Sequence, residues 1–178
     1  MENLLILRAV NAGTRHTVKM ADLRDWLTTA GLQHVQTYRN SGNAFFTSAR
    51  SRADCSQLVA DTLATHLDFT QPFGLFTRDE LLSTCAQAPA WWDGHSNRQH
   101  MLLFKLTTYV PDQDAWLMNQ LTPVDHVVCT PQFIFWTVDG QRGFQRSFYR
   151  QLIGTPFYQQ TSTRSYSTVK YFIHYFTK

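Results

Sequence analysis

The apolar positions in the first half of the chain predict alternating strands and helices. Residues 4–10 begin with four aliphatic side chains in a row, which is typical of a strand covered on both faces. Helical spacing of apolar residues predicts a helix over 20–30 that ends at Gly31. Residues 35–38 and 44–47 read as a β-hairpin around the turn at 40–43.

A second helix and a further strand complete this half. Ser51 followed by Asp54 indicates a helix start, and Leu58, Val59, Leu63 and Leu67 would form its buried stripe. Residues 73–76 predict the last strand. The resulting order is β-α-β-β-α-β, which is the ferredoxin-like plan.

The same plan recurs about 90–96 positions later, which indicates a duplicated supersecondary unit. Strands are predicted at 100–106, 127–129 and 133–138, with helices at 112–121 and 144–153. No fourth strand is evident in this half. The tail, 169–176, fits either a helix or a strand, and its i, i+3, i+4, i+7 spacing favours a helix.

We therefore expect an α+β fold of two similar ferredoxin-like βαββα(β) halves with antiparallel sheets and a C-terminal helix. The expected domains are residues 1–77, a helix and connector over 78–98, and residues 99–178. Two adjacent tryptophans, Trp91 and Trp92, indicate that the connector is packed against the protein.

Composition narrows the class of protein. The 178 residues are 43% hydrophobic and 16% charged, which argues against a disordered chain. No apolar run approaches the length needed to cross a bilayer, and no targeting signal is visible, so we expect a cytoplasmic protein without a membrane partner. Three cysteines without C-x-x-C spacing predict neither disulfides nor a thiolate metal site. We expect no metal and no cofactor.

Four segments together carry a family resemblance. They are Leu7-Arg8-Ala9-Val10-Asn11-Ala12-Gly13, Lys19-Met20-Ala21-Asp22-Leu23, Thr37-Tyr38-Arg39-Asn40-Ser41-Gly42-Asn43 and Thr163-Arg164-Ser165-Tyr166-Ser167-Thr168-Val169. In this joint order the chain resembles the bacterial DUF1697 family of uncharacterised proteins. The resemblance implies a duplicated ferredoxin-like fold and no known activity. Four positions depart from the family pattern, and they are Ala9, Thr14, Ser165 and Tyr166.

The strongest candidate site is a rim where the loop after the first strand should meet the hairpin turn. This rim gathers cations, amides and a hydroxyl, and it consists of Arg8, Asn11, Lys19, Ser41, Gly42 and Asn43. The C-terminal motif of the family adds Arg164 and Thr168 as possible contributors. Such a set would bind a small ligand that carries a phosphate or carboxylate. The alternative is structural: the amides satisfy local backbone groups, and the cations pair with acids such as Asp22.

A nucleic-acid-binding module is the alternative function. Arg142, Arg146 and Arg150 are spaced i, i+4, i+8 with aromatic residues between them, and no acid follows Gly140. On one helix these arginines would form a basic stripe, although a solvated helix face explains the same pattern. The aromatic content of 14% also leaves room for a protein-interaction module.

None of the seven histidines shows metal-ligand spacing with another histidine. Only His16 lies near the proposed rim, where it would act as a general acid or base if the protein is an enzyme. No catalytic motif decides that question. The oligomeric state is equally open.

Overall fold

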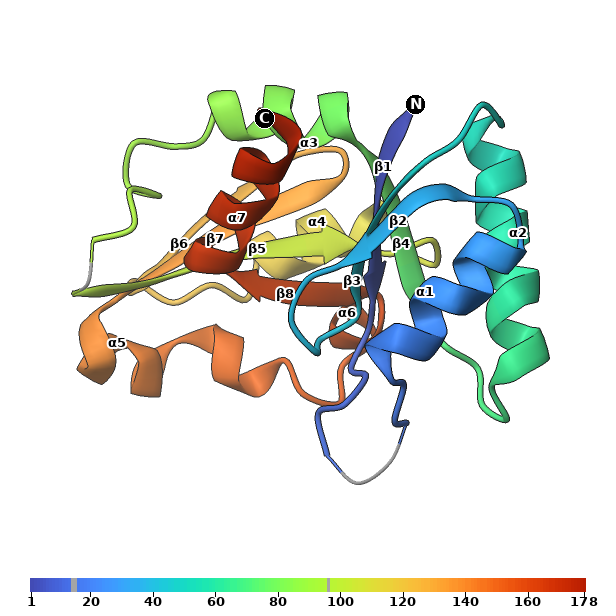
Figure 1. Cartoon of the computed structure of the whole chain (residues 1–178). Coiled ribbons are helices and arrows are strands. Elements are labelled where there is room, and N and C mark those ends of the chain that lie inside the picture. The colour runs from blue at the N-terminus through green and yellow to red at the C-terminus, as the bar shows by residue number, and fades with distance from the viewer. Residues whose placement is uncertain (14–15, 96) are drawn as a thin grey trace. The chain divides into compact units, whose positions relative to one another are not determined.

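Each half of the chain builds an antiparallel sheet, as the sequence predicts, and the fold is α+β (Figure 1). Each sheet has four strands, whereas the sequence predicts only three for the second half. The computed structural model describes residues 1–13, 16–95 and 97–178. The chain divides into two units, Met1–Arg78 and Asp79–Lys178.

The first unit follows the order β-α-β-β-α-β along the chain. Its elements are β1 (Glu2–Leu7), α1 (Met20–Thr29), β2 (Gln33–Thr37), β3 (Asn43–Thr47), α2 (Arg52–His66) and β4 (Phe73–Thr77). The strands lie in the order β2-β3-β1-β4. One sheet face packs against both helices in a buried cluster that includes Leu5, Phe46, Leu27 and Val59.

Local sequence signals set the helix ends in this unit. Ser51 is the N-cap of α2 and accepts a hydrogen bond from the Asp54 N–H at 3.2 Å. Gly31 follows α1 with a φ of 97°, a conformation that glycine adopts without steric cost. Both signals were readable from the sequence.

The second unit repeats the arrangement with extra helical segments. Its elements are α3 (Arg78–Ala86, which begins at the last residue of the first unit), β5 (Arg98–Lys105), α4 (Asp112–Met118), β6 (Asp125–Cys129), β7 (Phe133–Asp139), α5 (Gly140–Arg146), the 3-10 helix η1 (Phe148–Gln151), α6 (Pro156–Gln159), β8 (Thr161–Ser165) and α7 (Tyr166–Phe176). The strand order β6-β7-β5-β8 matches that of the first sheet position by position.

The fourth strand of this unit, β8, was not predicted. Its sequence, Thr-Ser-Thr-Arg-Ser, lacks the apolar alternation that marks a half-buried strand. Pairing supplies what the pattern lacks: β8 lies antiparallel to β5, with Leu102 opposite Arg164 and Leu103 opposite Thr163. The partner strand therefore decides the conformation of this segment.

The predicted helix over 144–153 is wrong. Helix α5 ends at Arg146, Ser147 is extended with φ −68° and ψ 142°, and η1 begins after it. The side chain of Asp125 causes the break, because it accepts hydrogen bonds from the Ser147 hydroxyl and from the Phe148 N–H at 3.0 Å. A fixed acceptor on the neighbouring β6 outweighs the helical preference of the segment.

The tail forms a helix, as its spacing favoured. In α7 the residues Val169, Phe172 and Phe176 are buried, and the Phe172 ring meets Phe104 of β5 edge-on at 6.2 Å. Phe104 lies on the opposite sheet face from the cluster around Met101 and Trp136. Helix α7 therefore covers the second face of this sheet.

The connector before β5 is packed down, as its tryptophans indicated. The Trp92 side chain is buried, and its indole N–H donates to the Met101 carbonyl at 3.0 Å. The cysteines are free thiols, and burial raises the pKa of Cys85 and of Cys129 to about 12. Of the helices described, none has the length and apolar character required to cross a bilayer.

Candidate functional site

The loop after β1 and the β2–β3 turn do lie together in the first unit. The Asn11 side-chain amide donates to the Asn40 carbonyl at 2.8 Å and to the Val18 carbonyl at 2.8 Å. Its oxygen accepts from the Val18 N–H at 2.9 Å. Asn11 therefore fastens both ends of its loop and ties the loop to the turn, and its amide groups are used in doing so.

The Ser41-Gly42-Asn43 turn is equally engaged with its surroundings. Asn43 is fully buried and donates to the Tyr38 carbonyl at 2.8 Å and to the Ser41 hydroxyl at 3.0 Å. Gly42 has a φ of 74°, and a Cβ there would lie 2.5 Å from the Leu7 Cβ. These motif residues shape the rim.

The cations of the rim lie on either side of the same loop. Arg8 is half-buried, and its backbone bonds to residues 71–72. Lys19 is exposed and is the N-cap of α1, but its side chain makes no capping hydrogen bond. Asp22 lies in the first turn of that helix and already complements its dipole. His16 stacks on Phe69, with ring centroids 4.4 Å apart.

Arg164 and Thr168 belong to the second unit. Arg164 is buried on β8, where its guanidinium donates to the Ser162 hydroxyl at 2.8 Å and to the Thr163 carbonyl at 2.9 Å. Burial lowers the pKa of Arg164 to about 10. The Thr168 hydroxyl is bonded to that of Ser165 at 3.1 Å. Thr14, another departure from the family pattern, lies outside the described residues.

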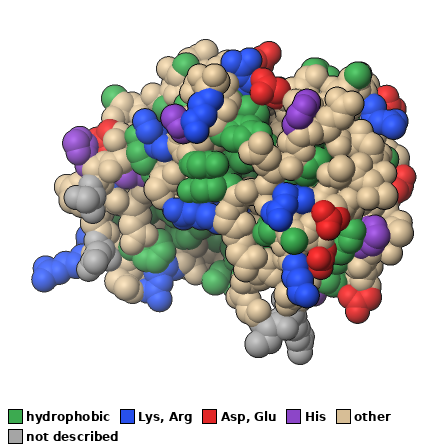
Figure 2. Space-filling view, viewed as in Figure 1, with side chains coloured by type: hydrophobic (Ala, Val, Ile, Leu, Met, Phe, Trp, Pro, Cys, Tyr) green, Lys and Arg blue, Asp and Glu red, His purple; other side chains and the backbone are tan. Residues whose placement is uncertain are grey.

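The three arginines of the proposed nucleic-acid stripe do not share a helix. Arg142 and Arg146 lie on α5, whereas Arg150 lies on η1 beyond the break at Ser147. Arg150 instead donates to the side chain of Gln145. On the face shown in Figure 2, Lys and Arg side chains are dispersed and form no continuous stripe.

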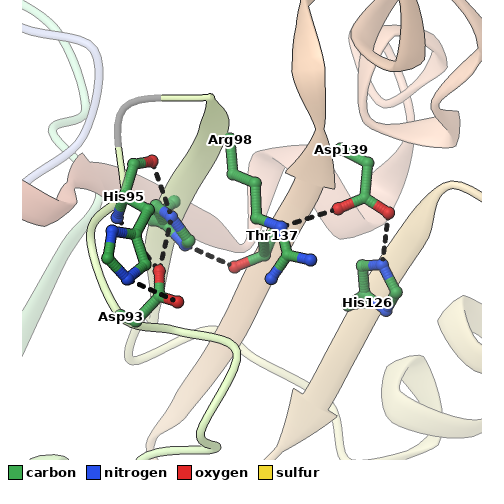
Figure 3. A network of polar contacts seen from close by, with 7 residues as sticks. Asp93, His95, Arg98, His126, Thr137 and Asp139 are labelled. Atoms are coloured by element: carbon green, nitrogen blue, oxygen red, sulfur yellow. Dashed lines mark hydrogen bonds and ion pairs between the residues drawn. The ribbon is translucent and has the colours of Figure 1, made fainter.

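A polar network that the sequence did not predict lies on the sheet of the second unit (Figure 3). The register of β5 and β7 places Arg98 opposite Asp139 and His100 opposite Thr137. Because these pairs are two residues apart along each strand, their side chains share one face of the sheet. This is also the face that carries Phe104 and α7.

One arm of the network fixes an arginine. The Arg98 Nε donates to Asp139 Oδ1 at 2.9 Å, and the other oxygen of Asp139 lies 2.8 Å from His126 Nε2. The hydrogen bond to His126 lowers the pKa of Asp139, so this carboxylate stays charged. Asp139 thus holds Arg98 by its Nε edge while His126 holds Asp139.

The other arm centres on His100, whose side chain is only 3% exposed. Its Nε2 lies 3.3 Å from Asp93 Oδ1 and 3.3 Å from the His95 carbonyl, and both are acceptors. Nε2 must therefore carry a proton, and Nδ1 accepts from the Thr137 hydroxyl at 2.8 Å. Burial lowers the pKa of His100, against the opposing effects of the His95 carbonyl and Asp93.

A pocket of about 470 Å³ opens beside this network and is lined by Asp93, His95, Asn97 and Arg98. A tight turn shapes its wall: Gly94 has a φ of 79°, and a Cβ there would lie 2.3 Å from the Tyr166 ring. Tyr166 is the first residue of α7 and also packs on Trp92, with centroids 4.6 Å apart. Tyr166, one of the four positions that depart from the family pattern, thus contacts the pocket wall.

The chemistry of the pocket is that of polar recognition. The order Thr137, His100, Asp93 resembles a hydrolytic triad, but Thr137 is fully buried and cannot reach a substrate. Among the described residues, no three His, Cys, Asp or Glu side chains gather as a metal site. Arg98, His95 and Asn97 instead offer hydrogen-bond donors at one opening.

A signal for this site was present in the sequence. His100 stands directly before the apolar run Met101–Phe104, where it becomes buried, and a buried polar side chain requires a partner. The partners themselves could not be predicted, because the Arg98–Asp139 and His100–Thr137 pairs depend on the register between strands about 40 residues apart.

Comparison with known proteins finds a family model that matches the chain and a solved structure of similar fold. The profile of a family described as protein of unknown function (DUF1697) matches residues 1–132. The conserved bacterial protein SP0830 from Streptococcus pneumoniae superposes with a TM-score of 0.91 at 28% identity, over 98% of each chain. The first two RRM domains of yeast poly(U)-binding protein Pub1 give a TM-score of 0.29 at 11% identity, over 92% of this chain and 98% of that one, which is too low to indicate a shared fold. Among curated proteins, none matches this sequence significantly.

Proposed function

Since the chain belongs to the DUF1697 family of proteins of unknown function, we propose a function from its geometry: it binds a small ligand through a phosphate or carboxylate group. The pocket beside Arg98 is the site that the geometry supports best. The observation that carries the proposal is the arginine held in place at the edge of a pocket of suitable size. About 300–1,000 Å³ is usual for small-molecule sites, and this pocket measures about 470 Å³.

Arg98 is prepared to bind an anion. Its interaction with Asp139 uses Nε, and the two Nη nitrogens are the pair through which an arginine can bind an anion in a bidentate manner. Asp139 and His126 restrict the side chain before a ligand arrives, which reduces the entropy lost on binding. The Arg98 side chain as a whole is about one-third exposed, at 34%, so solvent reaches this residue.

The other lining residues complement this anchor. His95 and Asn97 supply an imidazole and an amide that can donate to the remaining oxygens of the ligand. Asp93 brings a negative charge, but its carboxylate faces the imidazoles of His95 at 3.5 Å and His100 at 3.3 Å. Because Asp93 and Asp139 offset part of the positive charge, we expect affinity in about the micromolar to millimolar range.

The rim of the first unit is the second location for an anion. Lys19 is exposed at the start of α1, where backbone N–H groups and the helix dipole favour negative charge. Arg8 contributes a further cation to this rim. The amides of Asn11 and Asn43, which the sequence offered as ligand contacts, are bonded to the backbone, so the rim has fewer donors for a ligand than predicted.

A thermal-shift screen distinguishes the two locations. The panel contains inorganic phosphate, acetate, a nucleoside monophosphate, a sugar phosphate and a dicarboxylate. Three variants each remove one positive charge: Arg98→Gln, Lys19→Gln and the exposed control Lys170→Gln. A ligand at about 100 times its Kd adds roughly 2.7 kcal/mol of stability, which is several degrees for a protein of this size.

We expect a stabilising compound whose effect is lost in Arg98→Gln and kept in Lys19→Gln. The reverse result would move the site to the rim. Equal loss in all three variants would show only unspecific attraction to positive charge. If no compound shifts the melting temperature of the wild type, anion binding is the wrong function.

We propose three further assignments for this chain, namely its fold plan, its domain bounds and its location. The shared strand order supports a ferredoxin-like plan for both units. We also propose residues 78–98 as the region between two domains, 1–77 and 99–178, and a cytoplasmic location.

A further inference from the structure

We propose that His100 is a proton-operated latch that holds the wall of the Arg98 pocket, so that acid loosens the wall. The latch would regulate the pocket. Only its effect on ligand binding rests on the proposed function. The wall consists of Asp93, His95 and Asn97, which are three of the four lining residues, and the turn at Asp93 to His95 carries the first two of them. The latch itself can be measured without any ligand.

His100 is the side chain that fastens this turn to the sheet. It contacts the turn twice, through the Asp93 carboxylate and the His95 carbonyl, each 3.3 Å from Nε2. It contacts the sheet through Thr137 on β7 at 2.8 Å. The turn is further secured by packing of Gly94 on Tyr166 and by a backbone bond from the Arg98 N–H to the His95 carbonyl at 3.2 Å.

The neutral imidazole satisfies every partner that His100 has in the latch. With Nε2 protonated and directed at two acceptors, Nδ1 accepts a hydrogen bond from the Thr137 hydroxyl. A second proton on His100 would place two donors face to face, so the hydroxyl would have to turn away inside the sheet. The Thr137 oxygen could then accept from Nδ1, but its own proton would need another acceptor, and an unsatisfied donor is unfavourable at this fully buried residue.

The charges around His100 oppose one another. Asp93 and the His95 carbonyl, both on the turn, favour the protonated ring, whereas Arg98 at the start of β5 and the His95 imidazole disfavour it. Thr137 of β7 is uncharged, and Tyr166 of α7 presents its ring 5.8 Å away. Burial is the largest influence and acts with Arg98 and His95 to keep the pKa of His100 below its usual value.

The direction of the pH effect follows from linkage. A histidine whose pKa is lower in the closed form than in the open form takes up a proton when the turn opens. The closed form is therefore undisturbed above about pH 6.5, the usual value for a free imidazole, and loses stability relative to the open form as the pH falls below it. One proton changes the opening equilibrium by at most about tenfold between pH 7.5 and 5.5.

The latch makes a prediction opposite to that of simple electrostatics. Acid adds positive charge to histidines, which by itself would strengthen the binding of an anion. Loosening of the wall would weaken it. A ligand whose affinity falls between pH 7.5 and 5.5, after correction for its own protonation, would thus fit the latch.

Hydrogen exchange of the intact protein tests the latch directly. Protection of peptides that cover residues 89–99 is measured by mass spectrometry at pH 5.5 and 7.5, with correction for intrinsic exchange rates. Near-ultraviolet circular dichroism confirms that each protein is folded. We expect wild-type protection in this segment to fall by up to about tenfold at the lower pH, while the buried strands β1 and β3 stay protected.

Three variants test whether His100 causes the pH dependence of protection. His100→Gln has no titrating group and should remove the pH dependence, whereas His95→Gln and the exposed control His174→Gln should keep it. If His100→Gln does not fold, Asp93→Asn serves instead: it removes the charge that favours protonation, so the loss of protection in acid should be larger. Unchanged wild-type protection between the two pH values would overturn the latch, and so would a pH dependence that disappears in His95→Gln. Either failure would leave anion binding at Arg98 untouched.

Discussion

Asp125 offers the sharpest test of how the second unit is held together. Its carboxylate accepts from the Thr122 N–H and hydroxyl, the Trp136 indole, the Ser147 hydroxyl and the Phe148 N–H. The indole and the Ser147 side chain are almost fully buried. Replacing this acceptor by alanine therefore leaves several donors in the interior without a partner.

The magnitude follows from those donors. A buried donor left without an acceptor costs about 1–3 kcal/mol. Asp125→Ala leaves up to three buried donors without an acceptor, while water takes the place of part of the lost carboxylate. We expect a loss of roughly 3–5 kcal/mol in the free energy of unfolding, a large share of the 5–15 kcal/mol typical of proteins. The matched control Asp112→Ala removes an exposed acid from the first turn of α4 and should cost less than about 1 kcal/mol.

Urea denaturation followed by tryptophan fluorescence measures both variants. Burial pushes the pKa of Asp125 upward, but the hydrogen bonds from Ser147, Phe148 and Thr122 outweigh it and leave the pKa below its usual value of 3.8. The stability that the Asp125 carboxylate contributes is therefore present above pH 3.8 and is lost as the pH falls through the lowered pKa. The difference in the free energy of unfolding between wild type and Asp125→Ala should thus narrow toward about pH 3. A loss below about 1 kcal/mol at pH 7, or a gap that does not narrow in acid, would refute this account.

Three further outcomes are expected. Gly42→Ala should destabilise the first unit by more than about 1 kcal/mol, since its φ of 74° and the close approach of Leu7 both disfavour a Cβ. Thermal unfolding measures this loss. Gly13→Ala is the control, because a Cβ at Gly13 meets nothing within 4 Å. Asn11→Ala should increase proteolytic cleavage in the loop after β1, because the bonds to Val18 and Asn40 are lost; cleavage at the wild-type rate would contradict that role. Lys19→Gln should leave ligand binding at the Arg98 pocket unchanged in the thermal-shift screen.

Much of the fold could be predicted because its signals are local. The apolar run at Leu4 to Leu7, the cap at Ser51 and the stop at Gly31 each fix an element by its own sequence. The break after Arg146 could not be predicted in the same way, since an acceptor on β6 imposes it from a distance.

The candidate site, too, could be predicted from the sequence only where its signals are local. The motif residues of the rim were identified, and Asn11 and Gly42 hold the loop and turn together. The four residues that line the Arg98 pocket lie close together in the sequence, between Asp93 and Arg98. The pocket was missed because the groups that fix Arg98 and His100 come from β6 and β7, and only the strand register brings them to this place. His100 was a signal in the sequence, as a polar side chain beside the apolar run of β5.

A titration followed by two-dimensional ¹H–¹⁵N NMR tests the central claim most directly. Inorganic phosphate is added to the labelled wild type and to Arg98→Gln at constant pH and ionic strength. Binding at the pocket predicts saturable shifts at the amides of residues 93–98 that are absent in the variant, with little change at residues 19–22. Shifts confined to residues 19–22, or no saturable shift in either protein, would contradict the assignment of the Arg98 pocket as the anion site.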